Sequence, residues 1–129
     1  MAPHLYTYGK KEKLKSRKKL DQLFATGRTL SVSPLKVWYL PSNEEGVGAQ
    51  VGVGAGKRFF KRAVDRNRIK RVLREAYRHQ KHILMNEKGE AGNPVNIFFL
   101  YIGKALPATN LYPEMQKALQ KIKADYETA

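Results

Sequence analysis

The sequence contains no cysteine and has few acidic residues, with 11 Asp and Glu against 25 Lys and Arg among 129 residues. The absence of cysteine excludes disulfides, thiolate zinc sites and cysteine nucleophiles together. No apolar run approaches the roughly 20 residues of a membrane-spanning helix, since the longest, Val95 to Ile102, has the length of a strand. The first residues form no apolar signal segment, so we expect a cytoplasmic protein.

The excess of positive charge indicates a polyanionic partner. The formal net charge is +14 and the isoelectric point is about 10.1, which favours nucleic acid as that partner. A chain of this length forms one domain with a modest core. We therefore expect a single domain over 1–129, in which residues 1–13 are a flexible basic arm that either touches phosphates or is a frayed terminus.

Much of the positive charge is concentrated between Lys57 and Lys81. This stretch holds eleven Lys and Arg residues and only two acids, Asp65 and Glu75. A helical repeat from Val64 places five apolar residues on one stripe, namely Ile69, Val72, Leu73, Ala76 and Tyr77. Like charges four residues apart disfavour an isolated helix, whereas a bound polyanion offsets that repulsion and releases counterions. The pattern predicts an amphipathic helix whose cationic face meets a polyanion.

Periodicity also predicts the elements before this helix. We expect a helix over 14–24, with Ser16 as its N-cap and Gly27 at its end because glycine readily adopts positive φ. Alternating residues predict strands over 29–40 and 50–56. In the first strand, one face is apolar and the other carries a cation and an aromatic ring: Leu35, Val37 and Tyr39 against Lys36 and Trp38.

Two elements follow the basic helix. The run over 95–102 is apolar on both faces, which indicates a central strand covered on both sides. A last helix begins at Asn110, tolerates Pro113 in its first turn, and has the core stripe Met115, Leu119, Ile122 and Tyr126. The resulting order is α-β-β-α-β-α, which predicts an α+β sandwich with helices packed on a small mixed sheet.

Three glycines lie on one face of the strand over 50–56, at Gly52, Gly54 and Gly56. Glycine weakens a strand, so this face requires an explanation. Either another backbone approaches closely, as an extended RNA strand would, or the strand is strongly bent. The sequence leaves both explanations open.

No group of side chains is typical of a nuclease. Phosphodiester hydrolysis generally needs paired carboxylates on Mg²⁺ or a histidine acid/base pair, whereas Glu44 and Glu45 lie together in a turn. His79 and His82 lack a third metal ligand, and cations near a helix C-terminus have a simple electrostatic explanation. The glycines before Lys57 do not match the spacing of a phosphate-binding loop. We assign no catalytic or metal-binding side chain.

The basic helix contains a specific motif. The string R-N-R-x-K-R-x-x-R-E, which begins at Arg66, resembles the RNR signature of the protein subunit of bacterial ribonuclease P, and the likeness extends to Lys57-Arg58 and Ala63-Val64. That family has the same order of elements with one short extra strand, for which this sequence has no clear signal. The resemblance also implies a left-handed β-α-β crossover around the RNR helix, against the usual right-handed rule.

The resemblance implies a function without a catalytic side chain. In ribonuclease P, an RNA subunit and its Mg²⁺ ions remove the 5′ leader of precursor tRNA, and the protein assists this endonuclease. The expected partners are therefore the catalytic RNA and precursor tRNA, with Mg²⁺ acting at the level of the ribonucleoprotein. The family's catalytic RNA would face the basic helix and the residues before it, which here are Lys57, Arg58, Lys61, Arg62, Arg66, Asn67, Arg68, Lys70, Arg71 and Arg74.

Arginine suits this task because its planar fork binds phosphate oxygens in pairs. Two positions have an alternative interpretation. Asn67 either bonds RNA or orders the helix start, and Arg68 either contacts RNA or pairs with Glu75 or Asp65.

The resemblance further implies a cleft between the first helix and the sheet that holds the single-stranded leader. The matching positions are Leu20, Phe24, Lys36 and Trp38. Aromatic rings in such a cleft stack on unpaired bases, and Leu20 replaces an aromatic residue that is frequent in the family, so one stacking contact is expected to be missing. The competing interpretation of Phe24 and Trp38 is core packing.

Two other classes of protein compete with this interpretation. A structural RNA-binding protein, for example of the ribosome, fits the charge and size but leaves the motif and the aromatic residues unexplained. A helix-turn-helix regulator of DNA needs a second short helix before the basic one, whereas the sequence predicts a strand there. The sequence therefore favours the ribonuclease P role.

Overall fold

The computed structural model describes residues 13–42, 48–84 and 94–128, with side chains as far as Asp125. Its elements in chain order are α1 (Arg17–Thr26), β1 (Arg28–Val32), β2 (Leu35–Pro41), β3 (Ala49–Ala55), α2 (Ala63–Gln80), the 3₁₀ helix η2 (Lys81–Leu84), β4 (Val95–Tyr101) and α3 (Tyr112–Thr128). The predicted α+β class is confirmed. Residues 1–12 of the predicted arm lie outside the described part of the chain.

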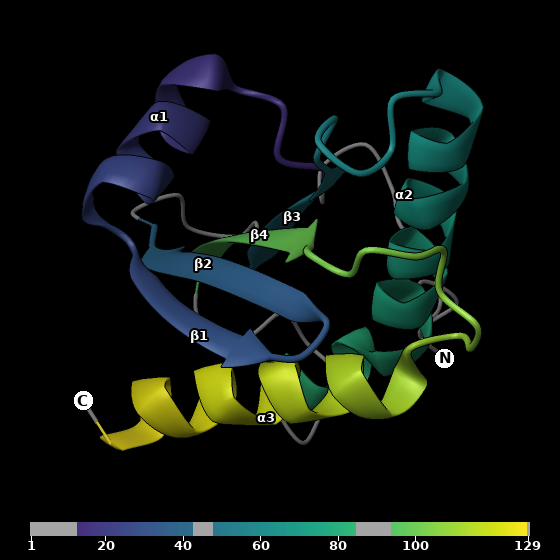
Figure 1. Ribbon diagram of the computed structural model, residues 1–129. Coiled ribbons are helices and arrows are strands. Elements are labelled where there is room, and N and C mark those ends of the chain that lie inside the picture. The colour runs from purple at the N-terminus through teal and green to yellow at the C-terminus, as the bar shows by residue number, and fades with distance from the viewer. Residues whose placement is uncertain (1–12, 43–47, 85–93, 129) are drawn as a thin grey trace.

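The four strands form one mixed sheet in the order β1-β2-β4-β3 (Figure 1). Strand β2 pairs antiparallel with β1 and with β4, whereas β3 runs parallel to β4. Since β4 lies between β2 and β3, its predicted central position is confirmed. The connection from β3 to its parallel neighbour β4 passes through α2, and the left-handed sense that the resemblance implies for it stays a prediction.

The extra strand lies where the sequence predicted a single strand over 29–40. That stretch forms two antiparallel strands joined at Ser33 and Pro34, with Val32 opposite Leu35 in the ladder. Proline cannot donate a ladder hydrogen bond, so Pro34 ends β1 and lies in the turn, where its carbonyl accepts a bond from the Ile102 amide at 2.9 Å. The prediction of one strand was wrong because it overlooked this proline.

The first helix begins at Arg17, directly after its predicted N-cap, Ser16. Ser16 caps α1 as expected, since its side chain accepts a bond from the Lys19 amide at 3.3 Å. Leu14 lies outside the helix, buried and extended along β3, and its amide donates to the Val51 carbonyl at 3.0 Å. Gly27 ends the helix at φ −70° rather than at positive φ; glycine is needed because a Cβ would lie 2.4 Å from the Leu23 carbonyl oxygen.

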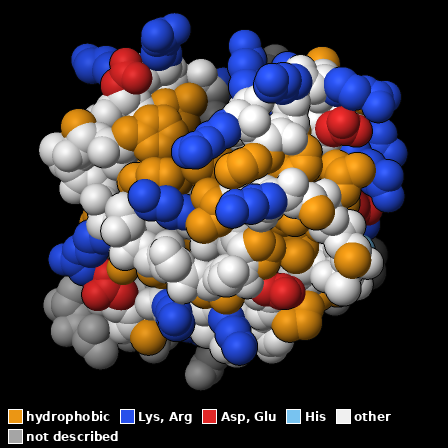
Figure 2. Space-filling view, in the orientation of Figure 1, with side chains coloured by type: hydrophobic (Ala, Val, Ile, Leu, Met, Phe, Trp, Pro, Cys, Tyr) orange, Lys and Arg blue, Asp and Glu red, His pale blue; other side chains and the backbone are white. Residues whose placement is uncertain are grey.

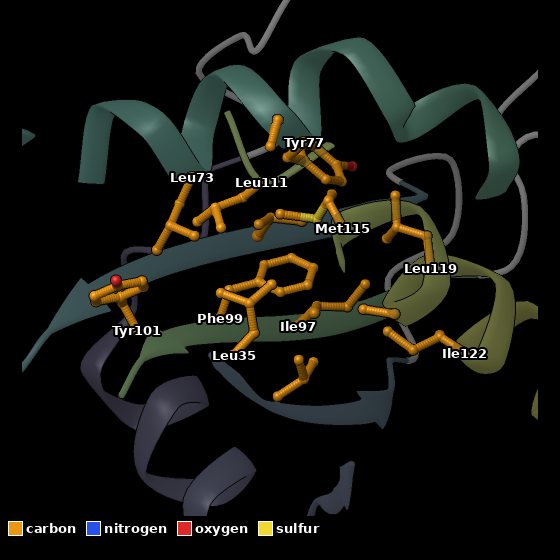
Figure 3. Packing of buried hydrophobic residues seen from close by; sticks show 14 of the residues in the cluster. Leu35, Leu73, Tyr77, Ile97, Phe99, Tyr101, Leu111, Met115, Leu119 and Ile122 are labelled. Carbon is orange, nitrogen blue, oxygen red and sulfur yellow. The ribbon is translucent and has the colours of Figure 1, made fainter. Parts of the chain in front are cut away.

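The core fills one side of the sheet (Figure 3), where α2 packs on β3 and α3 packs on β1 and β2. The predicted stripe of α2 is confirmed, although Val72 is only partly buried. The predicted stripe of α3 is confirmed at Met115, Leu119 and Ile122, which are fully buried, and the side chain of Tyr126 lies outside the described part. No helix among the described residues is long and apolar enough to span a membrane.

Asp125, near the end of α3, is hydrogen-bonded to the hairpin of β1 and β2. Its carboxylate accepts hydrogen bonds from Arg28 and, at 3.0 Å, from the Tyr39 hydroxyl. These bonds lower the pKa of Asp125 below its ordinary value of 3.8. Because the pKa is lower in the folded state, the stabilisation is complete above the unfolded pKa and is lost as pH falls through the folded one.

We therefore expect Asp125→Asn to lower the melting temperature at neutral pH and to lower it by less near pH 2, because the stabilisation is lost as pH falls through the folded-state pKa. Melting curves followed by circular dichroism at both pH values measure this. Asp21→Asn is the matched control, since Asp21 is exposed on α1 and makes no ion pair among the described residues. An equal effect of Asp125→Asn at both pH values would contradict the ionic role.

Candidate RNA-binding surfaces

The cationic residues of α2 and of the loop before it lie largely at the surface. Seven of the ten predicted RNA-binding residues are exposed, namely Lys57, Arg58, Lys61, Arg62, Asn67, Arg68 and Arg71. The other three, Arg66, Lys70 and Arg74, are partly buried. Lys81, the last cation of the basic stretch, is instead buried in η2 and does not join this surface.

Arg66 has a structural role that the sequence did not show. Its Nη1 atom donates to the carbonyl oxygens of Phe60 and Lys61, each at 2.8 Å. Helix α2 begins after Arg62 without a side-chain cap, so Arg66 holds the entering loop against the first turn. The guanidinium has five N–H donors, and among the described residues its side-chain hydrogen bonds all come from Nη1. Arg66 can therefore fix the loop and still present donors to a phosphate.

The alternative role of Arg68 is not supported. Asp65 Oδ2 lies 3.9 Å from Arg62 Nε. The Glu75 carboxylate accepts hydrogen bonds from Arg78 Nε at 2.8 Å and from Arg78 Nη2 at 3.1 Å. The Arg78 hydrogen bond lowers the pKa of Glu75. Within the part of the chain that the structure describes, Arg68 makes no ion pair and is exposed. Asn67 is likewise exposed and does not cap α2, whose N-cap is Arg62.

Three aromatic rings cluster on the other side of the sheet, beneath α1. Phe24 makes edge contacts with Trp38 and Phe98, at centroid distances of 5.1 and 5.2 Å, and Trp38 lies 6.3 Å from Phe98. Phe24 is 46% exposed and Trp38 is partly exposed, so neither is sealed in the core. Lys36 lies over the Trp38 ring, with Nζ 5.0 Å from its centroid. The predicted direction of Trp38, away from the core, is confirmed.

Phe98 belongs to this cluster but was not among the predicted site residues. The sequence showed β4 as apolar on both faces and so gave no reason to separate Phe98 from the core. Its ring lies over β3, where a Cβ on Gly54 would be 2.8 Å from Phe98 Cζ. At Gly52, a Cβ would be 3.4 Å from the Leu14 carbonyl oxygen. Of the two explanations left open for the three glycines, close approach holds at Gly52 and Gly54, where the neighbours are this chain's own backbone and ring. A Cβ on Gly56 would meet no described atom within 4 Å.

A groove of about 430 Å³ runs beside Phe98 and joins the two predicted surfaces. Lys70 and Arg74 of α2 form part of its lining, and Leu20 of α1 forms another part. The rest of the lining comes from the segment before α1 and from β3: Lys13, Leu14, Lys15, Val51, Gly52 and Val53. Figure 2 shows basic and hydrophobic side chains interleaved on the face between α1 and α2. The groove thus combines four cations with an aromatic ring.

The histidines do not form a metal site with other described residues. His79 packs its ring on Tyr112, with centroids 5.0 Å apart, whereas His82 lies exposed in η2. No cluster of three or more His, Asp or Glu suited to a metal ion occurs among the residues that the structure describes. Glu44 and Glu45 lie outside them.

The sequence matches the family model for ribonuclease P over residues 8–123. The chain belongs to the ribonuclease P protein family. It is 34% identical over 121 residues to the ribonuclease P protein component of Porphyromonas gingivalis, covering 93% of this chain and 86% of that one. It is 36% identical over 94 residues to that of Chlorobaculum tepidum, covering 67% and 61% respectively.

Solved ribonuclease P proteins share the fold. The Staphylococcus aureus protein superposes with a TM-score of 0.65 at 19% identity, covering 90% of this chain and 95% of that one. The Thermotoga maritima protein gives a TM-score of 0.56 at 19% identity, covering 91% and 93%. Family membership makes the chain an RNA-binding component of ribonuclease P, which works with the RNA subunit in tRNA processing.

Proposed function

We propose that the chain binds the catalytic RNA through the exposed cations of α2 and its preceding loop, and holds the 5′ leader of precursor tRNA in the groove beside Phe98. The observation that carries this proposal is the shared lining of the groove, where Lys70 and Arg74 lie within reach of the same ligand as Phe98 and Leu20. A single strand has both a charged backbone and free base faces, and this groove offers cations for one and a ring for the other.

The aromatic cluster supports the same assignment. Phe24 and Trp38 keep part of their surface exposed beside Phe98, and Lys36 adds a cation over the indole. Leu20 lines the groove without an aromatic ring, so Phe98 supplies stacking surface that this position lacks. A leader held there would extend from the cluster toward α2.

The proposed contribution to catalysis is electrostatic. Cations beside two RNA chains reduce the repulsion between their phosphates, so the particle binds precursor tRNA and Mg²⁺ more readily. The described side chains around the groove are chiefly basic or apolar, and such a set does not suit a Mg²⁺ ion, which prefers oxygen ligands. We therefore assign cleavage to the RNA subunit. A cytoplasmic location stays a prediction.

Reconstitution with the cognate RNA subunit tests the proposal. At low Mg²⁺, adding the protein should strongly accelerate removal of the leader from precursor tRNA, and the protein alone should bind RNA without cleaving it. Cleavage by purified protein in the verified absence of RNA subunit would contradict the assignment. Binding of ribosomal RNA with no effect on tRNA processing would indicate the structural class instead.

A further inference from the structure

Phe59 is an exposed aromatic ring that the two surfaces described above do not include. It lies in the loop between β3 and α2 and is 46% exposed. Two cations from separate loops lie over it, with Arg58 Cζ 5.4 Å and Lys104 Nζ 5.9 Å from the ring centroid. The loop sequence from Gly56 to Arg62 contains four cations and no acid.

The two loops that form this site are fixed to the same core residue, Tyr101. Phe60, next to Phe59, is buried and lies 6.0 Å from the Tyr101 ring. The Tyr101 hydroxyl donates to the Ala105 carbonyl at 2.7 Å and so holds the loop that carries Lys104. Burial raises the pKa of Tyr101, which keeps this donor protonated. The ring and its two cations are therefore positioned before any ligand arrives.

We propose that Phe59 is a stacking platform for an unpaired base of the RNA subunit, with Arg58 and Lys104 binding the phosphates on either side. Only an unpaired base can present its face to a side chain, because the faces of paired bases are covered within the helix. Cation–π contacts at exposed sites are weak, so a base can displace either cation from the ring toward a phosphate.

The charge around the ring favours RNA over a protein partner. Protein interfaces have apolar centres from which charged residues are depleted, whereas Phe59 lies between two cations in a basic loop. This inference rests on the proposed function and adds a base contact to it. The residues of the Phe59 site are not among those that line the groove.

The test measures affinity for the transcribed RNA subunit in the absence of tRNA. We expect Phe59→Leu to weaken binding about tenfold, because it keeps an apolar side chain but removes the ring, and Phe59→Trp to bind as the wild type does. The slope of log K against log salt should be unchanged in Phe59→Leu and should fall by about one unit in Lys104→Ala. Ile102→Ala is the matched control, since Ile102 is 45% exposed and has no role in the site; it should bind as the wild type does.

Wild-type affinity in Phe59→Leu, or an equal loss in Ile102→Ala, would overturn the platform. A failure of the wild type to bind the RNA subunit would overturn the proposed function instead.

A second measurement does not depend on truncating the ring. In a Trp38→Phe background, Phe59→Trp introduces the only tryptophan of the chain, and the RNA subunit should quench its fluorescence. Unchanged emission at saturating RNA would contradict the inference.

Discussion

Replacing Lys70 and Arg74 together by alanine is expected to weaken binding of both the RNA subunit and a leader-bearing precursor tRNA by roughly 100-fold, because a charge-assisted hydrogen bond contributes about 1.5–3 kcal/mol. Both residues belong to the cationic side of α2 and both line the groove. In the described part of the chain, neither makes an ion pair, so a phosphate would be their charged partner.

Filter binding over a range of salt concentrations measures this effect. The slope of log K against log salt should fall by about one unit for each lost phosphate contact. Lys117→Ala with Lys121→Ala is the matched control, because it removes two exposed cations that are also four residues apart on a helix, α3. An unchanged slope in the α2 variant, or the same loss in the α3 variant, would exclude a specific contact by Lys70 and Arg74.

Phe98→Leu is expected to weaken the binding of leader-bearing precursor tRNA to the reconstituted enzyme about tenfold, since one stacked base contributes roughly 1–3 kcal/mol. The binding of mature tRNA should be unchanged. Leucine keeps an apolar contact with Phe24 and with the glycine face of β3 but offers no ring to a base. The comparison of precursor with mature tRNA isolates the leader, because the two RNAs share every other feature.

Phe98→Tyr keeps the ring and should retain the preference for precursor tRNA. The melting temperature of each variant shows whether α1 is still packed on the sheet. Equal losses for precursor and mature tRNA in a folded Phe98→Leu variant would mean that the ring supports the fold and does not contact the leader.

Much of the fold was predictable because periodic burial determines it. The stripe Ile69, Leu73, Ala76 and Tyr77 and the alternation of Leu35, Val37 and Tyr39 led directly to the core that the structure shows. The RNR string likewise located the basic helix and its exposed cations. These features depend on residues close together in the sequence, where the spacing alone fixes which side chains share a face.

The remaining features depend on contacts between distant segments. Phe98 looked like one more core residue until β3 was placed beside β4, which set its ring over Gly54. Arg66 looked like a free cation, yet its bonds to Phe60 and Lys61 require the fold of the entering loop. The groove could not be predicted as a junction because it needs α1, β3 and α2 at their final distances.

The fluorescence of Trp38 tests the central claim most directly, because it is the only tryptophan in the chain and lies in the cluster beside the groove. In the reconstituted enzyme, we expect precursor tRNA with a 5′ leader to quench the emission at saturation, and mature tRNA at the same occupancy to leave it nearly unchanged. Equal quenching by both RNAs, or none by either, would contradict a leader held in this groove.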